Sequence, residues 1–87
     1  MYTLCLPKID YYVTKKQLYT VFNKYNFGDI YKIDLINIKD SKRAFVHYKS
    51  WNNTEKNTKV KNYLDDGLDI KIIYEFPWFW KCSKSKT

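Results

Sequence analysis

The sequence predicts an α+β domain in which a four-stranded antiparallel sheet carries two helices on one face. Four segments alternate apolar and polar residues with a period of two, and two others repeat apolar residues at helical spacing. They follow in the order βαββαβ, the split βαβ arrangement of ferredoxin-like folds, whose right-handed crossovers put both helices on the same face. We expect strands at residues 2–9, 29–38, 42–51 and 68–76, and helices at residues 15–28 and 52–67.

Local signals support each element in turn. Leu4 and Leu6 alternate with polar neighbours in the first strand, and Thr14 can cap the helix that follows. Gly28 and Gly67 are expected to end the two helices. The apolar faces of the helices consist of Leu18, Val21, Phe22 and Tyr25 in the first, and of the weaker set Val60, Tyr63 and Leu64 in the second.

The third strand contains the stretch SKRAFVHY, residues 41–48. Because successive side chains point to opposite faces, its residues divide into a set that packs in the core and a set that can bind a ligand. Ala44, Val46 and Tyr48 share the face that packs on the helices, and Arg43, Phe45 and His47 share the opposite, open face. The inward set is needed by any protein with this fold. The outward set carries whatever this face binds.

Length and charge restrict the class of protein. The chain of 87 residues fits one domain, and its net charge of +7 favours a polyanionic partner such as nucleic acid. Arg43 is the only arginine among 16 basic residues. Lysine binds phosphate as a point charge but cannot form the bidentate contact that arginine makes to guanine, so sequence-independent attraction to the backbone is expected.

Several functional classes have no support in the sequence. Cys5 and Cys82 form no close-spaced pair, so we expect no metal site, and free thiols are favoured over a disulfide between them. His47 is the only histidine, and no nucleophile has a recognisable base beside it. We therefore expect no enzyme activity and no cofactor. Without a signal peptide or an apolar run of 18 residues, the expected location is intracellular and soluble, cytoplasmic or nuclear, without membrane contact.

The octamer SKRAFVHY resembles a signature of the RNA recognition motif family. That pattern runs basic, Gly, aromatic, Gly or Ala, Phe, Val, any residue, aromatic; Ala44, Phe45, Val46 and Tyr48 match it, whereas residues 41–43 do not. The stretch LCLPKI, residues 4–9, is similar to the family's first-strand pattern but has Cys5 where an aromatic ring is usual. The resemblance covers residues 2–75 and implies a divergent, stand-alone member of the family.

The resemblance implies that the open sheet face binds single-stranded RNA, or single-stranded DNA, with low sequence specificity. Family members stack two or three bases on rings of the first and third strands. Phe45 is the one such ring kept here, and Arg43 can substitute by stacking its guanidinium plane. The expected contact residues are Phe45, Arg43, His47, Cys5, Lys42, Lys71, Trp78, Trp80 and Lys81.

The last residues, 77–87, are expected to form an aromatic and basic extension of an RNA-recognition-motif-like domain spanning residues 1–76. Pro77 is expected to stop the fourth strand. The rings that follow can stack bases, complete the core or cover the open sheet; for at least one tryptophan, the core is favoured. Trp51, after the third strand, is expected to fix the second helix to the core.

A second class of function is a protein-interaction or assembly subunit. Ile36, Ile73, Cys5 and Phe45 would give the open face an apolar strip, and exposed apolar patches usually mark interfaces. The partner would be another protein or a second copy of the chain, bound through this face or through the aromatic end. The residue composition also resembles that of small proteins of this family encoded by large DNA viruses with AT-rich genomes, which would place either function in an infected cell.

Overall fold

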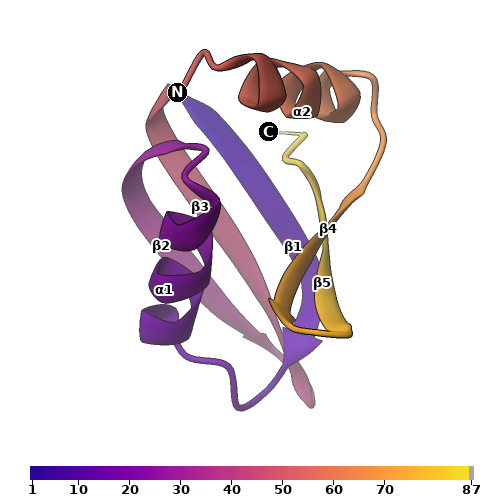
Figure 1. Cartoon of the computed structure of the whole chain (residues 1–87). Helices are drawn as coiled ribbons and strands as arrows, with labels where there is room; N and C mark the ends of the chain where they lie inside the picture. The colour runs from indigo at the N-terminus through magenta and orange to yellow at the C-terminus, as the bar shows by residue number, and fades with distance from the viewer. Residues whose placement is uncertain (87) are drawn as a thin grey trace.

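The computed structural model describes residues 1–86 and contains two helices and one five-stranded antiparallel sheet. The elements are β1 (Tyr2–Asp10), α1 (Lys15–Tyr25), β2 (Gly28–Ile38), β3 (Ser41–Trp51), α2 (Glu55–Asp65), β4 (Ile70–Glu75) and β5 (Trp78–Lys84). Their spatial order in the sheet is β2-β3-β1-β5-β4 (Figure 1). The α+β class is confirmed, and within the described residues the order is βαββαββ.

The sheet has one strand more than the sequence predicted. The segment expected as an extension, residues 77–87, contains β5, which lies between β1 and β4 and pairs with both. The fourth strand ends before Pro77, as predicted, but the sheet continues, because Pro77 lies in the turn between the paired residues Glu75 and Trp78. The segment that was predicted as the last strand, β4, therefore forms an edge of the sheet. The strand between it and β1 is β5, which was not predicted.

Each helix begins after a threonine whose hydroxyl accepts a hydrogen bond from a backbone N–H of the first helical turn. The Thr14 hydroxyl accepts from the backbone N–H of Gln17 at 3.2 Å, and Thr54 caps α2 in the same way. Asn26, in the left-handed conformation, ends α1 two residues before the predicted Gly28. Gly28 instead opens β2, where a Cβ atom would collide with the Ser50 carbonyl oxygen. Gly67, at φ 85°, follows the end of α2 as expected.

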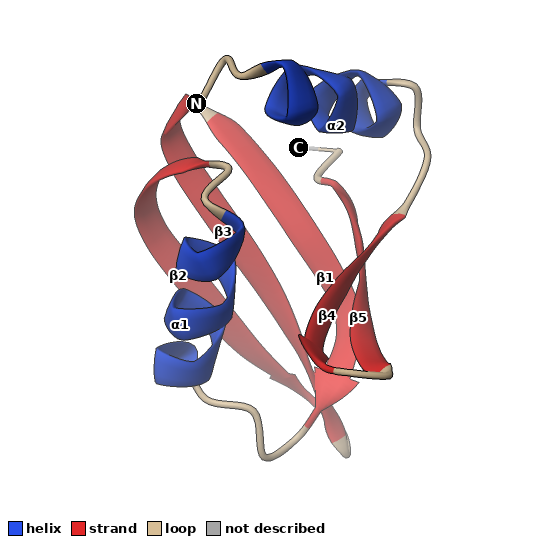
Figure 2. Ribbon diagram, viewed as in Figure 1, coloured by secondary structure: helices blue, strands red, loops and turns tan. Residues whose placement is uncertain are grey.

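The core lies between the sheet and the two helices, which cover the same face (Figure 2). The buried residues of β1 and β3 include Leu4, Leu6, Ala44, Val46 and Tyr48, as the alternation predicted. They pack with Leu18, Val21 and Phe22 of α1 and with Leu64 of α2. The edge strand β4 also reaches α1, because the Ile73 amide donates to the Tyr25 hydroxyl at 2.8 Å. No helix among residues 1–86 is long and apolar enough to cross a membrane.

Candidate functional site

The uncovered face of the sheet brings together most of the predicted contact residues. Phe45 lies on β3, directly across from Cys5 on β1 and from Asp34 on β2. Its neighbours Arg43 and His47 are on the same face, since the intervening Ala44 and Val46 are fully buried on the other. Residues 77–86 do not cover this face, because they lie in β5 and beside its two ends.

A chain of side-chain hydrogen bonds fixes His47 at the centre of this face. Nε2 of His47 lies 2.8 Å from Oδ2 of Asp34, and Nδ1 lies 3.0 Å from the Thr3 hydroxyl oxygen. Since a carboxylate can only accept, Nε2 carries a proton, and in the neutral ring Nδ1 accepts from the Thr3 hydroxyl. The three residues come from β2, β3 and β1, so the chain crosses three adjacent strands and holds the imidazole beside Phe45.

The contact with His47 also stabilises the charged form of Asp34. The hydrogen bond from His47 lowers the pKa of the Asp34 carboxyl below its ordinary value of 3.8, and the charges of Lys32 and Lys15 act in the same direction. A carboxylate whose pKa is depressed on folding adds stability above its unfolded pKa, and this contribution is lost as the pH falls through the folded value.

We therefore expect Asp34→Asn to destabilise the protein between about pH 4 and pH 7 and to have progressively less effect below about pH 4. Urea denaturation of both proteins across this range, followed by circular dichroism, measures the difference. In a His47→Gln background the same substitution should have a smaller effect, because the main partner of Asp34 is gone. A gap between wild type and variant that stays constant down to about pH 2 would contradict this account.

Arg43 reaches across to β1 on the open face, beside Cys5. Nε of Arg43 is 3.4 Å from the Pro7 carbonyl oxygen, so the guanidinium leans over the strand. Burial raises the pKa of the Cys5 thiol, and the nearby charge of Arg43 offsets part of this rise. At neutral pH Cys5 is therefore an uncharged thiol, half-buried across from Phe45. Cys82 is also a free thiol but is fully buried in the core.

The three rings of the run Trp78, Phe79, Trp80 have three different environments. Trp80 is 3% exposed and stacks on Tyr74 in the core, with ring centroids 4.5 Å apart, so the expected core role of one tryptophan is confirmed. Trp78 is 64% exposed beside the turn. Phe79, which was not among the predicted contact residues, is 45% exposed on the open face, directly across from Ile73.

The predicted lysines also divide between the two faces. Nζ of Lys71 lies over the Phe79 ring, 4.7 Å from its centroid, and Lys81, directly across from Lys71, shares the open face with Phe79. Lys81 is paired with Asp69 at 3.1 Å. Lys42, by contrast, extends to the helix side, where its Nζ donates to the Val13 carbonyl oxygen at 3.0 Å. Lys42 and Trp80 thus lie on the core side, and Trp78, two residues before Trp80 and beside the turn, is not on the open face either.

Phe45 and Phe79 mark the two ends of a diagonal stripe, which consists of Phe45, Arg43, Lys81, Phe79 and Lys71. Phe45 pairs with Cys5, Cys5 pairs with Ser83, and Phe79 lies four residues before Ser83. By their positions along β3 and β5, Arg43 and Lys81 both lie between the two rings. Two aromatic and three cationic side chains therefore lie together along one uncovered path.

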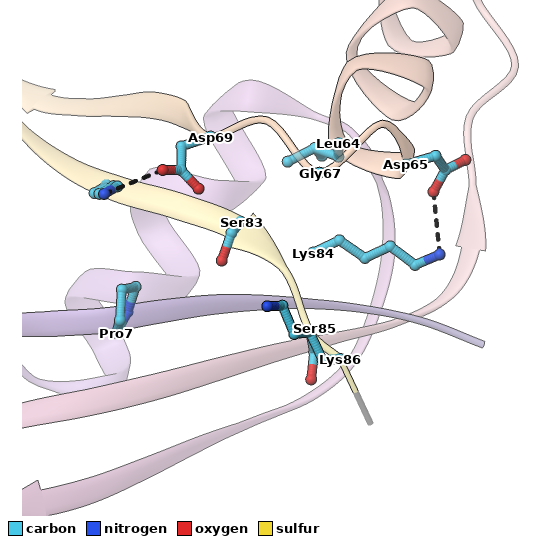
Figure 3. Close-up of a pocket in the computed structure, with 10 residues that line it drawn as sticks. Pro7, Leu64, Asp65, Gly67, Asp69, Ser83, Lys84, Ser85 and Lys86 are labelled. Carbon is cyan, nitrogen blue, oxygen red and sulfur yellow. Dashed lines mark ion pairs between the residues drawn. The ribbon is translucent and has the colours of Figure 1, made fainter.

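A cleft of about 670 Å³ lies beside the end of β5, between that strand and the loop after α2. Figure 3 shows Lys84 reaching toward Asp65 across the cleft, at a distance of 3.2 Å. Lys81, which also lines the cleft, is paired with Asp69. The cleft shares Lys81 with the stripe, but no aromatic ring lines it. The stripe adds two rings and the cations Arg43 and Lys71, so it is the better candidate for a ligand that carries both bases and phosphates.

Comparison with protein-family models, with curated proteins and with solved structures finds no match to this chain. The resemblance to the RNA recognition motif therefore rests on the octamer and on the first-strand pattern.

Proposed function

We propose that the protein binds single-stranded nucleic acid, with RNA as the expected form, through the stripe on its open sheet face. The observation that carries this proposal is the pairing of two partly exposed rings, Phe45 and Phe79, with Arg43, Lys71 and Lys81 on a surface that no segment of residues 1–86 covers. Aromatic rings stack on any base, and cations between them attract the phosphates.

The chemistry of the stripe favours weak sequence specificity. Two of its three cations are lysines, which attract phosphate without reading base edges. The net charge of +7 adds long-range attraction. The imidazole of His47 lies beside Phe45, but Asp34 and Thr3 engage both of its ring nitrogens, so it adds no free polar atom that could read a base.

The proposal predicts salt-dependent binding that requires Phe45. We expect an oligoribonucleotide of about 12 nucleotides to bind at low salt, with an affinity that falls with a log–log slope of about −3 if roughly four cations contact phosphates. Phe45→Ala should weaken binding roughly tenfold or more, since one stacked base contributes about 1–3 kcal/mol. Fluorescence anisotropy titrations from low to physiological salt measure both effects.

Phe76→Ala is the matched control, because this ring is 83% exposed but lies in the turn before β5. It should leave the affinity nearly unchanged, whereas Phe79→Ala should resemble Phe45→Ala. An equal loss for Phe45→Ala and Phe76→Ala, or no binding at low salt, would overturn the proposal. A parallel titration with the matching DNA oligonucleotide decides between the two nucleic acids.

A second candidate function is protein binding through the turn between β4 and β5. Phe76 and Trp78 are the two most exposed rings of this hairpin, and aromatic residues dominate the energetics of protein interfaces. The two functions use different residues. Replacing both rings with alanine should abolish capture of a protein partner but leave the affinity for the oligonucleotide unchanged.

A further inference from the structure

The two edges of the sheet differ in how they are protected. At the β4 edge, the Tyr25 hydroxyl accepts from the backbone N–H of Ile73. At the β2 edge, no side chain among residues 1–86 forms a hydrogen bond with the backbone of residues 30–37. This stretch contains no proline and no glycine. Proteins usually guard such an edge, because its free backbone groups can pair with another strand.

The hairpin between β2 and β3 determines which backbone groups face outward. Ile38 and Ser41 are paired across a two-residue turn, so Ile38 directs its N–H and C=O toward β3. Because these groups alternate in direction along an antiparallel strand, Leu35 and Ile33 direct theirs away from the sheet. The pairing of β2 with β3 is regular from Lys32 to Ile38, so this part of the edge is a continuous template.

The residues along this edge are self-complementary. In the stretch IYKIDLI, residues 30–36, polar and apolar positions are symmetric about Ile33. The two charged residues next to Ile33, Lys32 and Asp34, carry opposite charges. Lys32 and Asp34 pair with His47 and Phe45 of β3, so both lie on the open face. Their side chains are 55% and 44% exposed and only 3.9 Å apart at the closest charged atoms. Both are therefore accessible to a partner.

We propose that two copies of the chain associate through β2, antiparallel, with a two-fold axis at Ile33. In this register Lys32 lies across from the partner's Asp34, and Asp34 lies across from the partner's Lys32. Leu35 lies across from the partner's Tyr31, at the point where the pairing of β2 with β3 becomes irregular, so the regular part of the proposed pairing is residues 32–34 of each copy. A two-fold axis perpendicular to the sheet keeps both open faces on the same side of one continuous sheet.

A register centred on Leu35 would use the same edge but place both charges against aliphatic residues. Lys32 would lie across from the partner's Ile38, and Asp34 across from the partner's Ile36. Opposite charges directly across antiparallel strands are favourable, so the Ile33 register is preferred. A single strand pair buries less than the roughly 1,600 Å² of a standard stable interface, so the dimer should form only at high protein concentration.

Charge reversal tests both the dimer and its register. Sedimentation equilibrium over a range of concentrations should show a monomer–dimer equilibrium for the wild type. Lys32→Asp alone and Asp34→Lys alone should each weaken association about tenfold or more, because each creates two like-charged pairs across the axis. A one-to-one mixture of the two variants should associate again as a heterodimer, because two carboxylates on one strand then lie across from two ammonium groups on the other.

The one-to-one mixture distinguishes a variant that cannot pair with itself from one that does not fold, because an unfolded variant would not associate in the mixture. Asn37→Pro is a matched control: residue 37 lies outside the stretch that pairs about Ile33 but inside one centred on Leu35, and its N–H faces outward. It should leave the dimer intact. A wild type that stays monomeric at all concentrations, a mixture that does not associate, or a dimer abolished by Asn37→Pro would each overturn the proposal.

Discussion

A chain that ends at Phe76 is expected not to fold. Truncation there removes β5, and with it the strand that joins β4 to the rest of the sheet, because the two partners of β5 are β1 and β4. It also removes Trp80 and Cys82 from the core, where they are 3% and 0% exposed. Losing one buried tryptophan alone costs about 3–5 kcal/mol. A domain of this size has a total stability of about 4–13 kcal/mol, so the remaining interactions cannot hold the sheet.

The matched control is a chain of residues 1–85, which keeps β5 and the hydrogen bond from the Ser85 amide to the Thr3 carbonyl oxygen. Far-ultraviolet circular dichroism and amide NMR spectra should show a folded protein for residues 1–85 and an unfolded one for residues 1–76. A folded fragment of residues 1–76 would contradict the place of β5 inside the sheet and would restore the boundary at residue 76 that the sequence suggested.

The difference between the expected and observed sheets has a physical origin in the run Trp78, Phe79, Trp80. Strands are recognised from sequence by the alternation of apolar and polar residues, and three consecutive rings carry no such alternation. Only the following residues, Lys81, Cys82 and Ser83, show it. The preceding proline favours the end of a strand, but it is equally suited to the turn of a hairpin, and here it occupies the turn.

The sequence predicts which face of the sheet carries the candidate site, but not which side chains touch one another there. The alternation along β3 correctly places Phe45 and His47 together, because residues two apart in a strand share a face. Alternation within one strand does not show which residues of other strands lie beside them. The bonds from His47 to Asp34 and Thr3 depend on the registers of two strand pairs. Both pairs contain irregularities, one between Leu6 and Ile9 and the others in residues 29–32.

The second large effect is expected at Trp51, whose role in fixing α2 to the core was predicted and is confirmed. Its ring stacks on Phe27 at 5.1 Å and meets Tyr2 and Tyr48 edge-on at 5.0 and 5.2 Å. Its indole N–H donates to the backbone carbonyl of Asn57, in the first turn of α2, at 2.9 Å. One side chain therefore joins the end of β3, the start of β1 and the second helix.

Trp51→Ala should cost about 3–5 kcal/mol, a large fraction of the total, because a cavity would open among three rings and the carbonyl of Asn57 would lose its side-chain donor. Trp51→Phe should recover part of this loss by restoring ring contacts without the hydrogen bond, which contributes about 1 kcal/mol. Trp78→Ala, at a ring that is mostly exposed, should change stability by about 0.5 kcal/mol or less. Urea denaturation followed by circular dichroism measures all three.

Equal losses for Trp51→Ala and Trp78→Ala would mean that the ring cluster around Trp51 does not hold α2. The comparison also bears on the proposed binding surface. If Trp78→Ala folds with wild-type stability, any change in its affinity for an oligonucleotide or for a protein partner can be attributed to the lost contact. Trp51→Ala cannot serve that purpose, because a loosened α2 would disturb the end of β3, the strand that carries Phe45, Arg43 and His47.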